Sequence, residues 1–509
     1  MNNVESSTNS SVRVGPIFGV MIAGAFVAFL NQTLINVALP QIMERLQISA
    51  TTADWLTTIF MLVNGIVIPI TAFLIERFTT RQLYTASMGL FTLGTLVCGI
   101  APNFGVILVG RVVQAAGAGI LFPLVTNVIF TLFPAERRGM AMGIFGVAIN
   151  FAPAIGPTLS GWVVQSHSWR VLFFIIFPIA LIDVIVALFL VKNVSETSRP
   201  KLDTLGVILS TVGFGGLLYG FAMAGTKGWG STDVLTFFIA GGVAIALFLW
   251  RQMVVGHPIL EFRIFRYKMF SLTTVINVVV TMAMFAGMIL MPIYMQTVRG
   301  FSPILSGLML LPGGIIMGIM SPITGRLFDK IGARWLSVVG LAITVLTTYA
   351  LARLQVNTSF TYVTVVYTAR MFGMSILMMP IFTAGLNELP LTLNRYGTAM
   401  VNTLRMMAGA MGMAFFVSIM TNRAKTHTQD LMLKEHVAST DKVHMMIAAN
   451  HGMVMAINDA FFVATTLSLF AFALSFFIRK TSPMEDTISN RPRKARVSRS
   501  AHHSLAIEK

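Results

Sequence analysis

Fourteen apolar segments, each of roughly 18 to 25 residues, constrain this chain of 509 residues more than any other feature. A helix rises about 1.5 Å per residue, so each segment is long enough to cross a hydrocarbon layer about 30 Å thick. The runs are continuous and do not alternate, which excludes the strands of a membrane barrel. Because 55% of the residues are hydrophobic and only 11% are charged, an ordinary soluble domain is also excluded. The sequence therefore predicts an all-α polytopic membrane protein.

The predicted spans leave only short polar connections along most of the chain. They lie at residues 15–37, 54–75, 82–101, 104–126, 139–164, 171–191, 204–224, 233–250, 270–296, 304–325, 335–352, 361–385, 400–421 and 456–478. The polar start carries one cation and lacks a clear small-residue cleavage site, so we predict an uncleaved first span and not a signal peptide. The single cysteine, Cys98, permits no internal disulfide, so stability does not rest on an oxidising compartment.

The distribution of positive charge predicts the orientation in the membrane. With both termini in the cytoplasm, 24 of the 36 lysines and arginines lie inside, 9 lie outside and 3 lie within spans. Cytoplasmic loops of membrane proteins carry this kind of excess. We therefore predict a multi-pass protein of a bacterial plasma membrane, with both termini cytoplasmic.

The net charge of +17 also raises the question of nucleic-acid binding. The tail from Arg479 contains RPRKARVSR and holds 8 of the inside cations. A basic segment beside a membrane span binds anionic lipid headgroups. No aromatic-interleaved binding module accompanies it, so we predict that the tail contacts the lipid bilayer and that nucleic acid is not a partner.

Charged and amide side chains within the spans mark candidate sites. Arg111 lies in the fourth span, in GRVVQAAGAG, with Gln114 one helical turn away. A guanidinium there costs at least about 2.5 kcal/mol unless it is solvated or paired, so a protein that keeps one usually uses it. A buried arginine can also simply tie helices together through backbone carbonyls, and that alternative stays open. The other such groups are Asn31, Asn150, Asp183, Arg370 and Arg405, of which Asp183 is the only carboxylate near the middle of a span.

The fifth span contains an unusual face in GVAINFAPAIGPTLSG. Gly146, Asn150, Pro153, Pro157 and Gly161 are spaced +4, +3, +4 and +4, which puts them on one side of a helix. The prolines remove backbone donors and favour a bend, while the glycines let another helix approach closely. A generic small-residue packing seam is the alternative. We expect the partner to be the Gly- and Pro-rich segment 311–322, and we expect this contact to seal the outer side when a carrier faces inward.

An internal repeat organises the chain. Sliding the sequence by 253 residues places Ala72, Leu74, Glu76, Arg77, Arg81 and Leu83 over Gly325, Leu327, Asp329, Lys330, Arg334 and Leu336. The same order of acid, base and base thus follows the second and the tenth spans. Two six-helix halves separated by a two-helix insert account for fourteen spans, and repeated halves are typical of secondary transporters. The acids can pair with an arginine or a helix N-terminus opposite and so form a cytoplasmic gate, whereas the cations also satisfy the positive-inside rule.

The segment between the last two spans, residues 422–455, is the longest predicted outside connection. It contains His427, His436, His444 and His451. Their spacings of 9, 8 and 7 do not form a helical pair at i and i+4, so we predict a solvated loop and no metal site.

These motifs together resemble the major facilitator superfamily and, within it, the fourteen-helix drug/proton antiporter group. GRLFDKIGAR, from Gly325 to Arg334, is similar to the family's loop signature, and the first-half copy departs from it at Ala72, Glu76 and Thr79. GRVVQAAGAG resembles the fourth-helix motif. Gly156, Pro157 and Gly161 resemble the fifth-helix motif associated with antiporters, and the segment 401–415 is similar to the penultimate span of that group.

The resemblance implies the major facilitator fold and a division of the chain into five parts. These are a cytoplasmic N-terminal segment (1–14), a first six-helix half (15–191), a linker with two inserted helices (192–268), a second six-helix half (269–478) and a basic cytoplasmic tail (479–509). It also implies a monomeric, proton-driven exporter of amphipathic small molecules, without cofactors, which is not an enzyme. No phosphate-binding GxxxxGK[ST] or metal-binding HExxH motif occurs in the sequence.

One position conflicts with proton coupling. TLINVALP matches the first-helix motif of the group, but Asn31 stands where that motif usually has an aspartate. An amide cannot take up or release a proton at physiological pH. Asp183 is then the obvious alternative carrier, although by analogy the sixth helix is peripheral. The alternative function is export or flipping of an anionic or zwitterionic metabolite or lipid, because Arg111, Arg370 and Arg405 would make the cavity positive.

Overall fold

The computed structural model describes residues 14–194, 197–198, 202–256, 258–434 and 442–479, and these residues form helices and short connections without strands. The N-terminal residues 1–13 and most of the basic tail therefore lie outside the described part. The helices are α1 (Val14–Leu46), α2 (Ala50–Arg77), α3 (Thr80–Ile100), α4 (Phe104–Leu132), α5 (Ala135–Ser166), α6 (Arg170–Leu190), α7 (Thr204–Lys227), α8 (Thr232–Val254), α9 (Lys268–Ile293), α10 (Pro303–Ile331), α11 (Ala333–Leu351), α12 (Phe360–Asn387), α13 (Leu391–Lys434) and α14 (Lys442–Ser475). A 3₁₀ turn precedes α9, and a π-helical turn follows it (Phe262–Arg266 and Tyr294–Val298).

The predicted all-α membrane architecture is confirmed, with one helix at each of the fourteen predicted spans. Within the described residues, thirteen helices contain a stretch that is long and apolar enough to cross a membrane. The exception is α5, where the side chains of Pro153, Ala154 and Pro157 lie outside the described residues, so that no unbroken described stretch reaches the required length.

The residues that cap the helices in the two repeated loops explain one difference between the two copies. Thr79 caps α3 through a reciprocal capping box with Gln82. The position 253 residues later is Gly332, which ends α10 with φ of +79°. A glycine adopts that left-handed conformation without the strain that a Cβ atom would cause. The first copy of the loop uses an extended threonine cap instead, so it does not need the glycine of the second copy.

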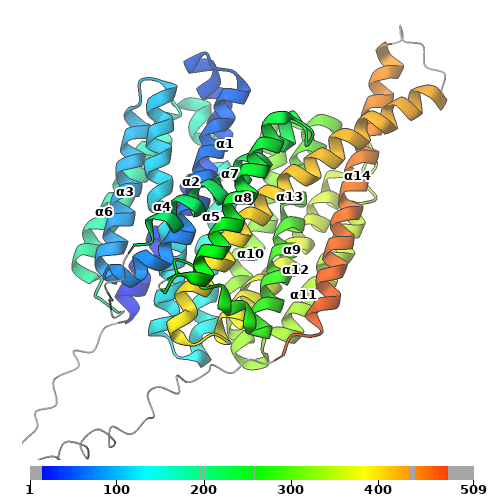
Figure 1. Ribbon diagram of the computed structural model, residues 1–509. Helices are drawn as coiled ribbons and strands as arrows, with labels where there is room; N and C mark the ends of the chain where they lie inside the picture. The colour runs from blue at the N-terminus through cyan, green and yellow to red at the C-terminus, as the bar shows by residue number, and fades with distance from the viewer. Residues whose placement is uncertain (1–13, 195–196, 199–201, 257, 435–441, 480–509) are drawn as a thin grey trace, which may run out of the picture.

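The helices run alternately up and down in two six-helix halves, α1–α6 and α9–α14 (Figure 1). We call the end at which α1 begins and α14 ends the termini end, and the end at which α13 stops and α14 starts the hairpin end. In the inserted pair, α8 packs on α7, and α7 packs against α2 of the first half and α13 of the second half. The insert therefore touches both halves.

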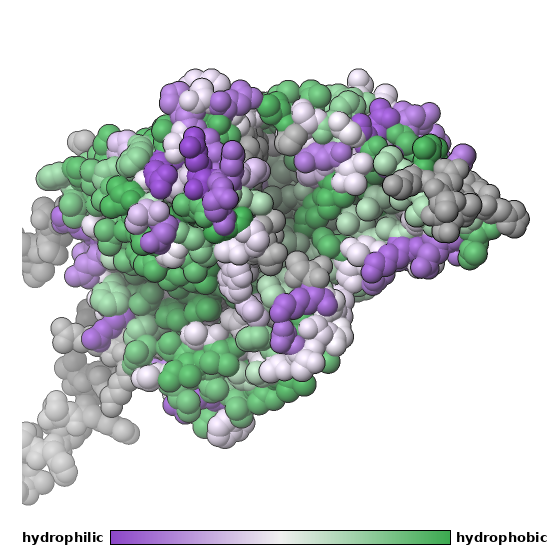
Figure 2. All heavy atoms as spheres, turned by 90° about the horizontal axis from the view of Figure 1, so that it is seen from above, coloured by the Kyte–Doolittle hydropathy of each residue, from purple (hydrophilic) through white to green (hydrophobic). Residues whose placement is uncertain are grey.

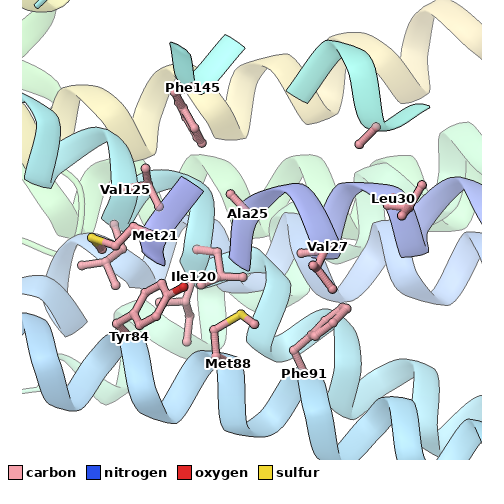
Figure 3. Packing of buried hydrophobic residues seen from close by; sticks show 14 of the residues in the cluster. Met21, Ala25, Val27, Leu30, Tyr84, Met88, Phe91, Ile120, Val125 and Phe145 are labelled. Carbon is pink, nitrogen blue, oxygen red and sulfur yellow. The ribbon is translucent and has the colours of Figure 1, made fainter. Parts of the chain in front are cut away.

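Close helix packing holds each half together. In the first half, Met21 and Val27 of α1 pack near Met88 and Phe91 of α3, with Ile120 of α4 beside them (Figure 3). A Cβ atom at Gly94 would lie 2.5 Å from the backbone nitrogen of Gln114, so α3 and α4 are in backbone contact there. Between membrane helices, van der Waals packing of this kind replaces much of the hydrophobic driving force available in water.

The prediction of a long solvated loop at residues 422–455 is wrong. Helix α13 continues to Lys434, and α14 begins at Lys442, so the described part of this segment is helical and projects from the hairpin end (Figure 1). His427 faces Asp459 of α14, with 2.9 Å between Nε2 and Oδ2, and Arg423 donates to the same oxygen at 2.7 Å. His436 lies outside the described residues. These polar contacts join two helices that extend beyond their apolar spans.

Candidate functional site

The surface is hollowed between the two halves when the molecule is seen from the hairpin end (Figure 2). Hydrophobic side chains extend down into this hollow. The two halves meet instead near the termini end, where α5 and α10 form the most extensive helix pair among the described elements. The candidate site therefore has two parts, which are polar and aromatic side chains within the bundle and a set of contacts between the halves at the termini end.

Arg111 is the centre of a buried polar cluster in the first half. Its side chain is 1% exposed, and its Nη1 donates to Oε1 of Gln114 at 2.8 Å and to Oδ1 of Asn31 at 3.3 Å. Its Nε donates to the carbonyl of Leu56 at 3.1 Å, and the guanidinium lies 4.2 Å from the ring centre of Phe60. The arginine thus joins α4 to α1 and α2, with amide and carbonyl oxygens as its acceptors.

The absence of a carboxylate at position 31 changes the charge of this cluster. Asn31 is buried and accepts from Arg111 as a neutral amide. Gln114 is oriented in turn by donating to Oγ1 of Thr95 of α3 at 2.8 Å. Within the described residues, no Asp or Glu lies within ion-pair distance of Arg111. The cluster consequently retains the full positive charge of the guanidinium.

Arg370 occupies the corresponding helix of the second half and is fully buried. Its Nε donates to Oγ1 of Thr348 at 3.0 Å, and its Nη2 donates to the carbonyl of Ala283 at 2.6 Å. A Cβ atom at Gly287 would lie 2.3 Å from its Nη1, which has no hydrogen-bond partner among the described residues. Each half therefore contains a buried arginine that links three of its own helices, and of these two arginines only Arg111 is bound by side-chain amides.

An aromatic cluster between the halves was not predicted from the sequence. Phe122 of α4 lies 5.1 Å from Phe145 of α5 and 6.2 Å from Phe382 of α12, measured between ring centres. Phe29 of α1 packs on the same ring at 6.1 Å. The guanidinium of Arg405, on α13, lies 5.8 Å from the centre of the Phe122 ring. Four phenylalanines and one arginine from both halves thus meet, and the rings of Phe145 and Phe382 are buried in this cluster.

Asp183 lies apart from this cluster, between helices of the first half. It belongs to the buried face of α6 and is 8% exposed. Its Oδ2 accepts a hydrogen bond from the hydroxyl of Tyr84 of α3 at 2.7 Å. A Cβ atom at Gly24 of α1 would lie 2.9 Å from the same oxygen, so α1 also touches the carboxyl.

Helices α5 and α10 are in direct backbone contact at the termini end. A Cβ atom at Gly139 would lie 2.5 Å from the carbonyl oxygen of Gly325, and a Cβ atom at Gly325 would lie 2.1 Å from the carbonyl oxygen of Gly139. One turn further along, a Cβ atom at Gly143 would lie 2.5 Å from the carbonyl oxygen of Ser321. Such distances leave no room for a side chain, so this interface depends on glycine from both halves.

The predicted face of α5 makes contacts with two different helices. Towards the termini end, Asn150 donates to Oγ of Ser321 at 3.1 Å, and Gly146 lies against the same serine of α10. Towards the hairpin end, a Cβ atom at Gly156 would lie 2.1 Å from Oγ1 of Thr33, so α5 leaves the second half and packs on α1. Gly161 is half-buried in this part of the helix. The side chains of Pro153 and Pro157 lie outside the described residues.

The structure thus brings α5 and the segment 311–322 together, as the sequence analysis expected. The contact in this structure lies at the termini end, and with the predicted cytoplasmic termini this is the side opposite to the expected outer seal. The reason is the conformation, because the hollow opens at the hairpin end while the termini end is closed. A seal at the hairpin end would require the halves to tilt the other way.

The two repeated acids each bind partners in the other half. Asp329 of α10 accepts from the backbone nitrogens of Gly139 and Met140 of α5, at 2.9 and 3.0 Å. Glu76 of α2 pairs with Arg395 of α13 at 3.1 Å and accepts from the hydroxyl of Tyr396 at 3.2 Å. Because α5 and α13 are equivalent helices of the two halves, the two crossings are related by the internal repeat.

The repeated cations are arranged differently from the acids. Arg77, Lys330 and Arg334 are exposed at the termini end and form no ion pair with the described residues. Arg81 stays within the first half, where it donates to the carbonyl of Leu188. The acids therefore join the halves, while the bases remain on the surface.

Arg138 is a further crossing residue that was not predicted. Its Nη1 donates to Oδ1 of Asn387 of α12 at 3.2 Å, and its Nη2 donates to the carbonyl of Phe130 at 3.0 Å. Its guanidinium lies 5.0 Å from the ring centre of Phe130. The run Glu136, Arg137 and Arg138 could have indicated this residue, but the sequence gives no sign of its partner 249 positions away.

A cavity among the described residues lies elsewhere. It has a volume of about 640 Å³ and is lined by α13, α14 and Trp229, near the ion pair of Arg423 and Asp459. This cavity does not include the buried arginines or the aromatic cluster. No group of three or more possible metal-binding side chains occurs in the described part of the chain.

Comparison with known proteins gives consistent matches over most of the chain. A family model described as Major Facilitator Superfamily matches residues 21–413. The chain is 48% identical to the uncharacterized MFS-type transporter YhcA of Bacillus subtilis, over 90% of this chain and 92% of that protein. It is 38% identical to the lincomycin resistance protein LmrB of Listeria innocua, over 94% and 99% of the two chains.

Two further matches are more distant. The chain is 30% identical to the multidrug export protein EmrB of Haemophilus influenzae, over 84% of this chain and 86% of that protein. Its structure superimposes on that of the proton:xylose symporter XylE with a TM-score of 0.61 at 14% identity, covering 93% of this chain and 98% of the other. At that identity the likeness shows the fold alone.

Proposed function

The chain belongs to the Major Facilitator Superfamily of membrane transporters, and from this premise we propose that it exports amphipathic small molecules in exchange for protons. The names of two relatives, one a lincomycin resistance protein and one a multidrug export protein, support export of drug-like compounds. We propose that the protein acts as a monomer in the plasma membrane of a bacterium, with both termini in the cytoplasm.

The observation that carries this proposal is the one-sided opening between the halves. Polar contacts across the halves lie at the termini end, through Asp329, Glu76 and Arg138, whereas the hairpin end is hollowed. A carrier that alternates access needs contacts that form in one state and break in the other. With the termini in the cytoplasm, this structure corresponds to the outward-open state, from which an exported molecule leaves.

The aromatic cluster supports an amphipathic cargo. The rings of Phe122, Phe145 and Phe382 come from both halves, so a molecule that binds them contacts both moving parts. Arg405 adds a cation beside the Phe122 ring. A bound molecule that prefers one arrangement of the halves would shift the equilibrium between states, as exchange requires.

The proton part of the proposal can be tested in everted membrane vesicles energised by respiration. Addition of ethidium or lincomycin should collapse part of the pH gradient in vesicles that contain the protein, because each exported molecule enters the vesicle as protons leave. Vesicles without the protein supply the baseline. Transport of either probe without proton movement would rule out antiport, and transport of neither would remove these probes as cargo.

A second candidate function is favoured by the charges in the bundle. Arg111, Arg370 and Arg405 form no ion pair with any described Asp or Glu, so the bundle carries uncompensated positive charge. We propose that this charge lies along the transport path, where it favours an anionic or zwitterionic metabolite or lipid. Export of that class by gradient alone would need no proton carrier at position 31.

Substitution of Asn31→Asp separates the two candidates. Arg111 lies 3.3 Å from the amide oxygen, so an aspartate would form an ion pair and neutralise the cluster. For a cationic multidrug cargo, we expect resistance of cells to ethidium to rise several-fold. For an anionic cargo, we expect no gain, and the negative charge of the aspartate should reduce export instead.

A further inference from the structure

The carboxyl of Asp183 is positioned to bind a proton between three helices. It lies on the buried face of α6, opposite α1 and α3. The ring of Tyr84 extends from α3 toward α1 beside Met21 and Met88 (Figure 3). Its hydroxyl lies 2.7 Å from Oδ2 of Asp183 and 3.0 Å from the backbone carbonyl oxygen of Val20 of α1.

Counting protons favours a protonated carboxyl in this arrangement. The hydroxyl of Tyr84 has one proton, but both of its close neighbours, the Val20 carbonyl and the Asp183 carboxylate, are acceptors. If Asp183 carries a proton, it donates to the Tyr84 oxygen, and the hydroxyl donates to Val20. Both short contacts are then hydrogen bonds, whereas an ionised Asp183 leaves one of them without a proton.

The surroundings also lack a compensating charge. Helices α1, α3 and α5 pack against α6. Tyr84 is the titratable group that faces Asp183 from α3, while α1 presents the carbonyl of Val20 and the backbone of Gly24. In the described part of the chain, no Lys, Arg or His from α1, α3, α5 or α6 itself lies within ion-pair distance of the carboxyl. An uncompensated buried charge is costly within a membrane, which again favours the neutral acid in this conformation.

Helix α1 connects this carboxyl to the transport path. A Cβ atom at Gly24 would lie 2.2 Å from the Tyr84 hydroxyl, so α1 rests directly on the Tyr84–Asp183 pair. About two helical turns further along α1, Asn31 accepts a hydrogen bond from Arg111. The carbonyl of Leu34 accepts from Ser160 of α5 at 2.7 Å. A shift of α1 at Gly24 would therefore reach both the buried arginine and α5.

We propose that Asp183 is the proton-binding site of the carrier and that its protonation fixes α1 against α3 and α6. This inference rests on the proposed proton exchange and names the group that performs it. When the proton leaves, the Tyr84 hydroxyl turns its single proton to the carboxylate, and the hydrogen bond to Val20 is lost. The released proton passes to water, and α1 is freed from the pair. Rebinding of a proton restores both hydrogen bonds.

The first experiment measures proton binding without any cargo. Infrared difference spectra of the purified protein, recorded between neutral and alkaline pH, should contain a band of a protonated carboxylic acid. The band should be absent from Asp183→Asn and should persist in Asp233→Asn, which removes an exposed carboxylate paired with Lys227. Tyr84→Phe keeps the acid but removes its partner, so the band should move to higher frequency. An unchanged band in Asp183→Asn would overturn the proposal.

The second experiment measures coupling with radiolabelled lincomycin in proteoliposomes. In Asp183→Asn, uptake driven by a pH gradient should fall at least about tenfold, while exchange of labelled for unlabelled lincomycin at equal pH should stay within about twofold of wild type. Asp233→Asn should behave as wild type in both assays. Gradient-driven uptake at the wild-type rate in Asp183→Asn would overturn the proposal. If the wild type shows no gradient-driven uptake, the proposed antiport fails for this cargo, and the infrared experiment still decides whether Asp183 binds a proton.

Discussion

The two acids that join the halves occupy equivalent positions in the repeat but bind different kinds of partner. Asp329 accepts from two backbone nitrogens of α5, beside the direct contact of Gly139 with Gly325. Glu76 binds side chains of α13, which are the guanidinium of Arg395 and the hydroxyl of Tyr396. One crossing is thus made by backbone groups and the other by side chains.

This difference predicts unequal tolerance of substitution. Side chains can change rotamer or be replaced by others of complementary charge, so the Glu76 crossing can be rebuilt from different residues. Backbone N–H groups near the start of a helix have fixed positions, and they donate only to an anion or dipole that reaches them. The Asp329 crossing also needs two glycines, because the backbones touch. We therefore expect α5 and α10 to dominate closure at the termini end.

The largest effect is expected for Gly139→Leu or Gly325→Leu. Either side chain would overlap the opposite backbone, and overpacking of this kind typically costs about 1–3 kcal/mol, or roughly five- to 150-fold in the population of the closed state. Export should fall by a similar factor, while membrane insertion stays normal. Gly242→Leu on α8 is a matched control, since a Cβ atom there meets no neighbour within 4 Å.

Closure at the termini end can be measured directly with spin labels. Phe78 and Ile331 are exposed at that end, one in each half, and Cys98 is the only cysteine to remove first. In a Cys98→Ala background, labels at Phe78→Cys and Ile331→Cys should report a longer distance by double electron–electron resonance when Gly139→Leu is added. A wild-type distance together with wild-type export in both leucine variants would show that the glycine contact is dispensable.

The sequence is sufficient to locate the helices because each apolar run is a local signal of spanning length. It fails at the extensions of α13 and α14, since their polar ends lie beyond the apolar length that marks a span. The internal repeat also predicts that Glu76 and Asp329 are equivalent. Their partners are not predictable in the same way, because nothing local in the sequence distinguishes a backbone nitrogen of α5 from the guanidinium of Arg395.

The side chains within the bundle show the same limit. Arg111, Arg370 and Asp183 are recognisable in the sequence because a charged residue in an apolar run is rare. The phenylalanines around Phe122 are not recognisable, since phenylalanine is common in most spans and 39 occur in the chain. The Tyr84–Asp183 pair joins positions 99 residues apart, which only the packing of α3 on α6 brings together.

An intermediate effect is expected for Asp329→Asn. The amide oxygen can still accept one hydrogen bond, but the charge and one acceptor are lost, at a cost of about 1.5–3 kcal/mol for a bond to a charged group. The closed population at the termini end should fall at least about tenfold, measured with the same label pair. Lys330→Gln changes the charge of the neighbouring exposed residue and should leave the distance unchanged. Equal effects of the two substitutions would show that net charge, and not the bonds to α5, closes this end.

The smallest effect is expected at the Glu76 crossing, and here alone it should be reversible by exchange. Glu76 and Arg395 are partly exposed, with side-chain exposures of 15% and 26%, so their ion pair contributes about 1 kcal/mol or less. Glu76→Arg should lower export and the closed population up to about fivefold, and Arg395→Glu should do the same. The double exchange should restore most of both, because the two side chains can pair in either order. No exchange of this kind exists for Asp329, whose partners are backbone nitrogens. The hydroxyls of Tyr396 and Ser198 also donate to the Glu76 carboxylate, so failure of the double variant would mean that Glu76 depends on these hydroxyls more than on Arg395.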